Sequence, residues 1–216
     1  MYVNPSFKTD VDRAWAYVVA RGFGSVVGID DGTPVASQVP LLVTNGADGP
    51  RLEFHLARPN PLIEVLARNP RVLVTVSGPD AYISPDWYAS ADQVPTWNYL
   101  AAHITGTARV LAPELTLDHV ERMSLHFEDR LRPKKPWSTS KMTPAKRTAM
   151  TRAIVAMEID VERIEAATKL SQNKVMSDRM EAARMLAWRG SWSEGALAEA
   201  MRGEIRSETM AQKEAV

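Results

Sequence analysis

Aromatic rings and hydrogen-bonding side chains are concentrated between Gly78 and Gly106. This stretch holds two of the six Trp, three of the five Tyr and one of the four His. They fall in two packets, Ala81–Tyr88 and Val94–Tyr99, with a polar loop at residues 89–93 between them. A planar ligand with a polar rim needs ring faces to stack on and donors at its edge, and both are present here. The same composition also suits a buried aromatic cluster that joins two strands.

A second candidate site is the segment at residues 57–61, which precedes a predicted short helix at residues 62–69. Asn60 suits the capping position, and the proline after it suits the first helical position. Free N–H groups at a helix N-terminus attract phosphate, and Arg58 adds charge and paired donors. His55, one strand step earlier, is in position to donate to a phosphate or ribityl oxygen. An ordinary capped helix with a solvent-facing arginine fits the same residues, so both interpretations stay open.

Other site chemistries find no support in the sequence. The four histidines stand far apart without an accompanying carboxylate grouping, so no metal site is predicted. The absence of cysteine excludes disulfides, thiolate ligands and cysteine nucleophiles. No nucleophile elbow, Walker loop or dinucleotide fingerprint occurs, and no catalytic residue is identified. The histidines are His55, His103, His119 and His126.

Composition limits the broad class of the protein. At 216 residues with 45% hydrophobic residues, the chain suits one domain, or one domain with appendages. A formal net charge of zero gives no overall field toward nucleic acid or an anionic membrane. No apolar run approaches the roughly 18 residues that span a bilayer, and the N-terminus lacks a signal pattern. We therefore expect a soluble cytoplasmic protein without a membrane partner.

One local exception to the neutral charge lies between Arg130 and Lys146. Basic residues there surround Trp137, which is a pattern that suits binding to DNA phosphates. Stretches of this kind are more often solvated surface, so both interpretations remain. The basic residues are Arg130, Arg132, Lys134, Lys135, Lys141 and Lys146.

The elements that would position these residues can be predicted from periodicity and turn signals. Strict alternation at residues 51–56 puts Leu52, Phe54 and Leu56 on one face of a strand and Arg51, Glu53 and His55 on the other. Turn signals include the segment at residues 45–50, and Gly106 suits a bend or bulge. Several strands and turns with few helices within some ninety residues indicate a small antiparallel barrel. The predicted strands are residues 25–29, 34–44, 51–56, 71–77, 102–111 and 155–161.

Helical spacing dominates the remainder of the chain. A helix is predicted from Thr9 to the glycines at 22 and 24, and apolar residues repeat with helical spacing from Leu115 to Leu131. Further helices are predicted at residues 143–153, 177–189 and 193–202. The tail from Ser207 is expected to fray.

Five collinear segments resemble the PaiB family of FMN-binding negative transcriptional regulators, which are linked to protease synthesis and sporulation. The segments are MYVNPSF, HLARPNP, GPDAYISPDWY, VPTWNY followed closely by His103, and KLSQNK, and they span residues 1–174. The resemblance implies an α+β protein with a mainly β core. Its fold would be a split β-barrel of the flavin-reductase and pyridoxamine-phosphate-oxidase type, with peripheral helices and a helical C-terminus. It also implies a homodimer with FMN at the subunit interface.

Carried onto this chain, the resemblance implies a set of FMN-binding residues. Ala57, Arg58 and Asn60 would bind the phosphate with His55 alongside, and Lys169 would offer positive charge where a reduced flavin is negative. Lys174 departs from the family pattern, in which the last packet usually ends in Arg, so a bidentate contact there would be weaker. The other implied residues are Ser37, Gln38 and Val39 along the ring, Trp97, Asn98 and Tyr99 packed on or near it, and Ser171, Gln172 and Asn173 closing the pocket.

The resemblance also implies a domain division and two functions. The FMN-binding domain would cover residues 1–174 with a helical insertion at 113–153, and residues 175–216 would form a helical extension. The first function is a dimeric negative transcriptional regulator that acts directly on DNA or through a partner. The alternative is a flavin-dependent reductase or oxidase, because the fold hosts both classes.

Overall fold

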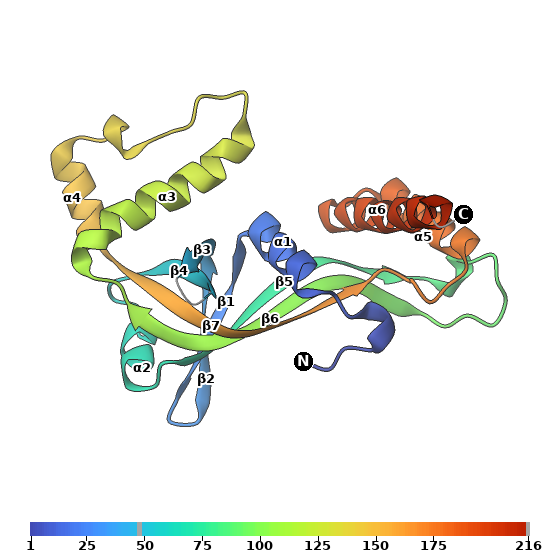
Figure 1. Cartoon of the computed structure of the whole chain (residues 1–216), viewed down its shortest axis with the longest axis horizontal. Helices are drawn as coiled ribbons and strands as arrows, with labels where there is room; N and C mark the ends of the chain where they lie inside the picture. The colour runs from blue at the N-terminus through green and yellow to red at the C-terminus, as the bar shows by residue number, and fades with distance from the viewer. Residues whose placement is uncertain (47–48, 215–216) are drawn as a thin grey trace. The chain divides into compact units, whose positions relative to one another are not determined.

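The computed structural model describes residues 1–46 and 49–214, with side chains to residue 210. Residues 47 and 48, in the predicted turn at 45–50, lie outside the described residues. The strands form one sheet in the order β2-β1-β5-β6-β7-β4-β3, and the pairs β1–β2, β1–β5, β3–β4 and β4–β7 are antiparallel (Figure 1). The strands are β1 Phe23–Asp30, β2 Thr33–Pro40, β3 Leu42–Gly46, β4 Gly49–Ala57, β5 Arg71–Ile83, β6 Thr96–Val110 and β7 Ile154–Lys169.

Helices precede, interrupt and follow these strands. They are α1 Val11–Arg21, α2 Leu62–Arg68, α3 Thr116–Glu128, α4 Pro144–Arg152, α5 Met176–Arg189 and α6 Trp192–Glu214. The cap signals explain several of the boundaries. Thr143 Oγ1 accepts a hydrogen bond from Lys146 N at the start of α4, and Gly190 ends α5 in the left-handed conformation at φ 73°.

The structure corrects the single strand predicted at residues 34–44. The chain forms β2 and β3 there, separated at Leu41, whose N–H donates to the Gly22 carbonyl at 2.9 Å. Pro40 is the last β2 residue paired with β1 and has no N–H to continue the ladder. The chain therefore leaves β1 at this point and pairs next with β4.

The tail predicted to fray from Ser207 is also different, because α6 continues to Glu214. Within this extension the Glu208 carboxylate receives two hydrogen bonds from Arg179 of α5, with N–O distances of 2.5 and 2.9 Å. The Arg179 side chain is only 4% exposed, so the pairing ties the last turns of α6 to a buried partner. Such tertiary contacts stabilise a helix end that local sequence alone would leave weak.

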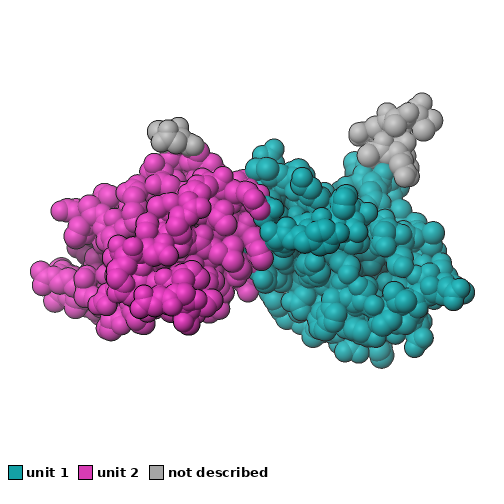
Figure 2. Space-filling view, turned by 90° about the horizontal axis from the view of Figure 1, so that it is seen from below, with its two compact units in different colours: residues 1–14, 77–102, 165–216 teal, residues 15–76, 103–164 magenta. Residues whose placement is uncertain are grey.

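Two compact units make up the chain, drawn in teal and magenta in Figure 2. Unit 1 comprises residues 1–14, 77–102 and 165–216, and unit 2 comprises residues 15–76 and 103–164. The core of unit 1 packs the end of β5 against α5 and α6, with Ile83, Leu186 and Leu197 fully buried. The core of unit 2 lies within the sheet and includes Phe54 and Ile104, also fully buried. The predicted division at residue 174 stays a prediction.

The aromatic packets lie at the ends of two strands that are longer than predicted. β5 extends to Ile83 and β6 begins at Thr96, so Trp97 to Tyr99 are strand residues. Gly106, farther along β6, is required by a close approach to β7, since a Cβ there would lie 2.2 Å from the Asp160 carbonyl oxygen.

Candidate functional site

The segment between β4 and α2 is held by the Asn60 side chain. Its Oδ1 accepts a hydrogen bond from Leu62 N, the first residue of α2, at 2.9 Å, although Pro61 and not Asn60 stands at the cap position. Its Nδ2 donates to Ser37 Oγ of β2 at 3.0 Å. Asn60 and Ser37 are thus brought together, and the amide fixes the start of α2 relative to β2.

Arg58 is exposed but anchored. Its Nε donates to the Arg152 carbonyl at 2.6 Å and its Nη2 to the Ile154 carbonyl at 3.0 Å, while its own N–H donates to the Ala153 carbonyl at 2.8 Å. The guanidinium therefore bridges to the end of α4 and the start of β7. Ala57, the last residue of β4, is exposed beside it.

The β2 residues predicted to line the flavin ring face different surroundings. Gln38 is exposed and its Oε1 accepts a hydrogen bond from Ser25 Oγ at 2.9 Å. Val39 is only 2% exposed, because its side chain belongs to the core. Val39 can therefore reach a ligand only through its main chain.

His55 lies in a buried polar cluster that the sequence did not reveal. Its Nδ1 is 3.1 Å from Nε2 of His119 on α3, and Nδ1 of His119 is 2.8 Å from Oε2 of Glu53. Arg122, one turn after His119, binds both carboxylate oxygens of Glu53 at 3.0 and 2.8 Å. The polar face of β4 predicted from alternation is therefore covered by α3, with Glu53 4% exposed and His119 fully buried.

Burial and neighbouring groups shift the pKa values of Glu53 and His55. Burial alone would raise the pKa of Glu53, but the hydrogen bonds from His119 and Arg122 outweigh it and hold that pKa below its ordinary value. Burial, together with the neighbouring His119, lowers the pKa of His55 to about 4. His55 is consequently a neutral imidazole at neutral pH.

A pocket of about 200 Å³ opens beside His55 in unit 2. The i, i+3 spacing of His119 and Arg122 among the apolar residues of α3 was a partial signal for the polar cluster beside this pocket, because it places two polar groups on one helix face. It did not identify their partners on β4. The lining residues are His55, Leu117, Val120, Trp137, Thr139, Met142, Arg147, Met150, Thr151 and Ile154.

In unit 1, the residues of β6 predicted to pack near the flavin ring alternate between two faces. Trp97 is 54% exposed and contacts Tyr82 edge to face, with ring centroids 6.3 Å apart. Asn98 is fully buried, and its Nδ2 donates to Ser171 Oγ at 2.9 Å. Among the described residues, its Oδ1 has no hydrogen-bond partner. Tyr99 shares the Trp97 face by strand alternation.

The packet after β7 lines a second pocket, of about 160 Å³, together with Asn98. Lys169 Nζ donates to Thr96 Oγ1 at 2.6 Å, and burial lowers the pKa of this lysine. Ser171 adopts φ 62°, a left-handed conformation that turns the chain sharply. Gln172 uses its amide on the main chain, accepting from Leu170 N and donating to the Thr168 carbonyl. The pocket lining is Phe7, Val94, Thr96, Asn98, Lys169, Ser171, Asn173 and Lys174.

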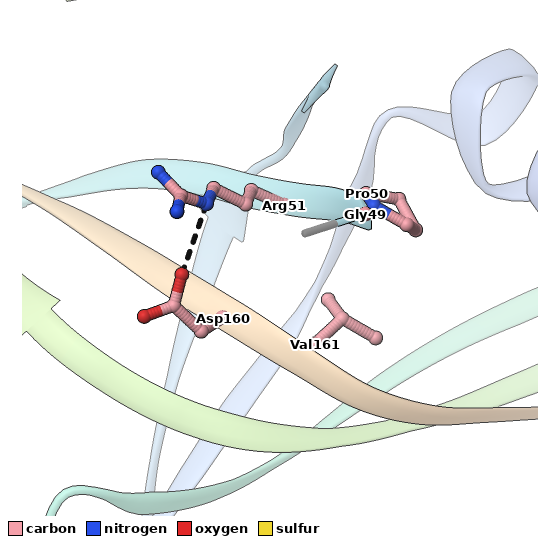
Figure 3. A pocket seen from close by; sticks show the side chains of 5 residues that line it. All are labelled: Gly49, Pro50, Arg51, Asp160 and Val161. Atoms are coloured by element: carbon pink, nitrogen blue, oxygen red, sulfur yellow. Dashed lines mark ion pairs between the residues drawn. The ribbon is translucent and has the colours of Figure 1, made fainter. Parts of the chain in front are cut away.

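A third pocket, of about 280 Å³, is lined by Gly49, Pro50, Arg51, Asp160 and Val161 (Figure 3). Arg51 of β4 faces Asp160 of β7, with Nε and Oδ1 3.0 Å apart, and its Nη1 is 3.2 Å from Glu158 Oε1. The guanidinium is thus matched by two carboxylates, so this pocket offers no unmatched charge to a ligand. Within the described residues, no group of three or more potential ligands is placed to hold a metal ion.

Comparison with known proteins decides the family. Residues 1–163 match the family described as "Putative FMN-binding domain". The chain is 34% identical over 214 residues to "Protease synthase and sporulation protein PAI 2" of Bacillus subtilis (strain 168), an alignment that covers 96% of this chain and all of that protein. This chain belongs to the PaiB family. The prediction of FMN as the cofactor is confirmed at the level of this family.

Solved structures support the fold predicted from the PaiB resemblance. The FAD and heme binding protein from Mycobacterium smegmatis superimposes with a TM-score of 0.56 at 16% identity, covering 85% of this chain and 80% of that chain. The flavocytochrome Anf3 from Azotobacter vinelandii gives a TM-score of 0.56 at 14% identity, covering 78% and 72%. The split β-barrel fold is therefore confirmed. No helix of the described part has the length and hydropathy needed to cross a membrane.

The residues that the PaiB resemblance assigns to FMN divide between the two units. Unit 2 holds Ser37 to Val39, His55, Ala57, Arg58 and Asn60, and unit 1 holds Trp97 to Tyr99, Lys169 and Ser171 to Asn173. The unit 1 pocket fits one end of a flavin, because an unpartnered buried acceptor and a lysine suit the polar edge of the ring.

Proposed function

We propose that this chain is an FMN-binding negative transcriptional regulator that acts as a homodimer. The observation that carries the proposal is the 34% identity to PAI 2 along nearly the whole of both chains, together with the FMN-binding family match. Different regions of the structure are proposed to contact DNA, flavin and a second copy of the chain, and a separate experiment tests each of these three contacts.

The segment proposed to contact DNA is the basic stretch from Arg130 to Lys146, which runs from the end of α3 into the first turn of α4. Some of its basic residues already have partners within the chain. Arg132 pairs with Asp129 and Lys134 pairs with Glu128. Arg130 donates to the carbonyls of Val19 and Ala20. Among the described residues, Lys135, Lys141 and Lys146 make no ion pair and are exposed. These three lysines are the groups best placed to neutralise phosphates.

The DNA experiment measures binding of the purified protein to its own promoter region across a salt series, with and without FMN. Replacing Lys135, Lys141 and Lys146 by Gln should weaken binding and reduce the slope of log K against log salt by about 2 to 3. A control variant removes the same amount of positive charge from another region, the helices α5 and α6. It replaces Arg184, Arg189 and Arg202 by Gln. No binding to promoter DNA at any salt, with unchanged transcript levels after gene deletion, refutes the regulator.

For the flavin, we propose that Arg58 and Asn60 bind the phosphate and that Asn98, Lys169, Ser171 and Asn173 contact the ring edge. Bound FMN would supply electron transfer chemistry. The chain's own residues orient it: Asn60 holds the phosphate loop against Ser37, and Lys169 brings a positive charge to a partly buried site. Trp97 and Tyr99, on the other face of β6, are proposed to pack near the ring.

Arg58→Ala should lower FMN affinity by about 1.5–3 kcal/mol, because a charge-assisted contact to phosphate is lost. Flavin absorbance retained after gel filtration, and titration of apoprotein with FMN, measure the effect. Arg68→Ala is the matched control, since Arg68 is an exposed arginine on the last turn of α2 that pairs with Asp30. Equal flavin retention in the two variants contradicts the assignment of Arg58.

Support for the homodimer comes from exposed aromatic side chains of unit 1. Trp97 is 54% exposed, Tyr82 47% and Trp188 77%. Large exposed rings are typical of protein interfaces. Light scattering during gel filtration should give a dimer mass for the wild type and a lower mass for a Trp97→Glu or Trp188→Glu variant, whereas a monomeric wild type refutes the dimer.

A flavin-dependent oxidoreductase is the second candidate. The observation in its favour is His55, a neutral imidazole beside a pocket, which is able to accept a proton. Anaerobic bleaching of bound FMN by NADH or NADPH, followed by turnover on an added acceptor, would support the enzyme. Bound FMN that neither nucleotide reduces would exclude it for these donors.

A further inference from the structure

The hydrogen-bond chain from Glu53 fixes which nitrogen of His55 is left to face the pocket. A carboxylate only accepts, so His119 Nδ1 donates to Glu53. His119 Nε2 then lies 3.1 Å from His55 Nδ1, so these two nitrogens share one hydrogen bond.

His55 Nε2 is consequently the ring nitrogen left for a ligand. Among the described residues it has no hydrogen-bond partner, and His55 lines the pocket of unit 2. The site thus offers one imidazole nitrogen, held in orientation by a second buried histidine. A ligand with a hydroxyl group can satisfy it.

The walls and size of the pocket define the body of the ligand. Leu117, Val120 and Met142 contribute apolar wall, as do Met150 and Ile154, and Trp137 adds an aromatic ring. A cavity of about 150 Å³ with apolar walls is enough to bind benzene. The volume of about 200 Å³ therefore suits a single substituted ring.

Arg147 of α4 supplies a positive charge to the pocket. It is half-buried and lines the same pocket, and among the described residues its guanidinium makes no ion pair. A guanidinium beside apolar walls is well suited to a planar carboxylate, which it can bind through two parallel hydrogen bonds.

We propose that the pocket formed by His55, α3, α4 and the start of β7 binds a small hydroxylated aromatic carboxylic acid. The ring occupies the apolar walls, the hydroxyl hydrogen-bonds with His55 Nε2 and the carboxylate pairs with Arg147. The site uses His55, which the resemblance also places beside the FMN phosphate, but none of the residues proposed for the flavin ring edge.

The test uses three related probes in calorimetric titrations of the full-length protein. 4-Hydroxybenzoate carries both polar groups, benzoate lacks the hydroxyl and phenol lacks the carboxylate. We expect 4-hydroxybenzoate to bind about tenfold more tightly than benzoate, and at least tenfold more tightly than phenol. The titrations are repeated after removal of flavin, and binding should persist, which separates this site from the proposed FMN function.

Each polar contact has a variant that removes one preference and leaves the other. His55→Leu should abolish the preference for 4-hydroxybenzoate over benzoate, and Arg147→Gln should abolish the preference over phenol. Thr151→Phe narrows the pocket and keeps the His55 ring and the Arg147 guanidinium, although it removes the hydrogen bond from Thr151 Oγ1 to the Arg147 carbonyl, and it should abolish binding of all three probes. Thermal unfolding of each variant verifies that it is folded, and the Thr151 variant keeps the test valid if His55→Leu does not fold.

Two results would overturn the proposal. The first is that none of the probes binds the wild type at millimolar concentration. The second is that Thr151→Phe binds all three as the wild type does, since the occupied site would then lie elsewhere.

Discussion

Two buried polar clusters of this chain differ in how completely their hydrogen bonds are made. In unit 2, both carboxylate oxygens of Glu53 and both nitrogens of His119 have partners. In unit 1, Asn98 is equally buried, yet its Oδ1 has no partner among the described residues.

The difference separates a structural cluster from a binding surface. A fully paired buried network holds its members in one geometry, and removing one member leaves the others unpaired. A buried acceptor without a partner costs free energy that a ligand can recover by donating to it. Glu53 and His119 thus position His55, whereas the Asn98 Oδ1 is left open to the flavin contact proposed above.

The largest expected effect is that of Glu53→Gln. The substitution leaves Arg122 and His119 with an amide in place of a carboxylate, and we expect it to lower the free energy of unfolding by about 3 kcal/mol. Urea denaturation measures the change. Glu162→Gln is the control, because Glu162 is an exposed partner of Arg71 and should alter stability little. If both variants lower the free energy of unfolding by the same small amount, the fully paired Glu53 cluster does not contribute more than an exposed ion pair, and the contrast with the Asn98 site is lost.

The second effect is a loss of stability at mildly acidic pH. An unfolded His55 binds a proton below about pH 6.5, whereas the folded one does so only below about pH 4. The unfolded chain therefore binds more protons across that window. The stability that neutral His55 contributes is complete above pH 6.5, decreases as the pH is lowered, and is lost near pH 4. With allowance for partial solvent exposure it amounts to about 2 kcal/mol.

His55→Leu removes the titrating group, so its unfolding free energy should vary less between pH 6.5 and 4.5 than that of the wild type. Glu53 contributes little in that window, because a carboxylate with a lowered pKa loses its contribution only at more acidic pH. Parallel pH profiles of the two proteins would show that His55 is not the group responsible.

Asn98→Leu should separate stability from binding. The change removes the unpaired oxygen together with the Ser171 contact, so the unfolding free energy of the flavin-free protein should change by less than about 1 kcal/mol. FMN affinity should fall about tenfold, or about 1.4 kcal/mol, if Asn98 contacts the flavin as proposed. Ser207→Ala, an exposed change on α6, is the control. Retained affinity in the Asn98 variant would place the flavin elsewhere.

The smallest effect concerns Lys174, where the family pattern usually has Arg. Its Nζ lies 2.5 Å from Gln93 Oε1 and 5.5 Å from the Tyr88 ring centroid, at the rim of the unit 1 pocket. Lys174→Arg restores a planar group able to make two hydrogen bonds and should tighten FMN binding by about 0.5 kcal/mol. Competitive titration against the wild type resolves this difference, and weaker binding would contradict it.

Local patterns predicted much of the fold. Alternation placed Leu52, Phe54 and Leu56 in the core, and all are at most 3% exposed. Turn and cap residues predicted α2 and α4 within about a residue, because those boundaries depend on side chains adjacent in sequence. Strand ends at Ile83 and Thr96 were missed, since pairing to distant strands decides where a strand stops.

Local sequence could not reveal the candidate site on β4. Arg51, Glu53 and His55 alternate as an exposed polar face would, and only α3, more than sixty residues later, buries Glu53. The contact between His55 and His119 spans 64 residues, a separation over which no sequence pattern fixes spacing. The FMN residues came from the resemblance, and their contacts with flavin stay predictions.

The strands β6 and β7 are neighbours in the sheet, yet the chain between them contains α3 and α4 (Figure 1). A tight hairpin would be enough to join such neighbours, so this excursion is an addition to a scaffold that is topologically complete without it. The partners of the Glu53 carboxylate, His119 and Arg122, belong to α3 and therefore to that addition. Homologues that lack the excursion should therefore carry a different residue in place of Glu53, and the two traits should be gained or lost together in evolution.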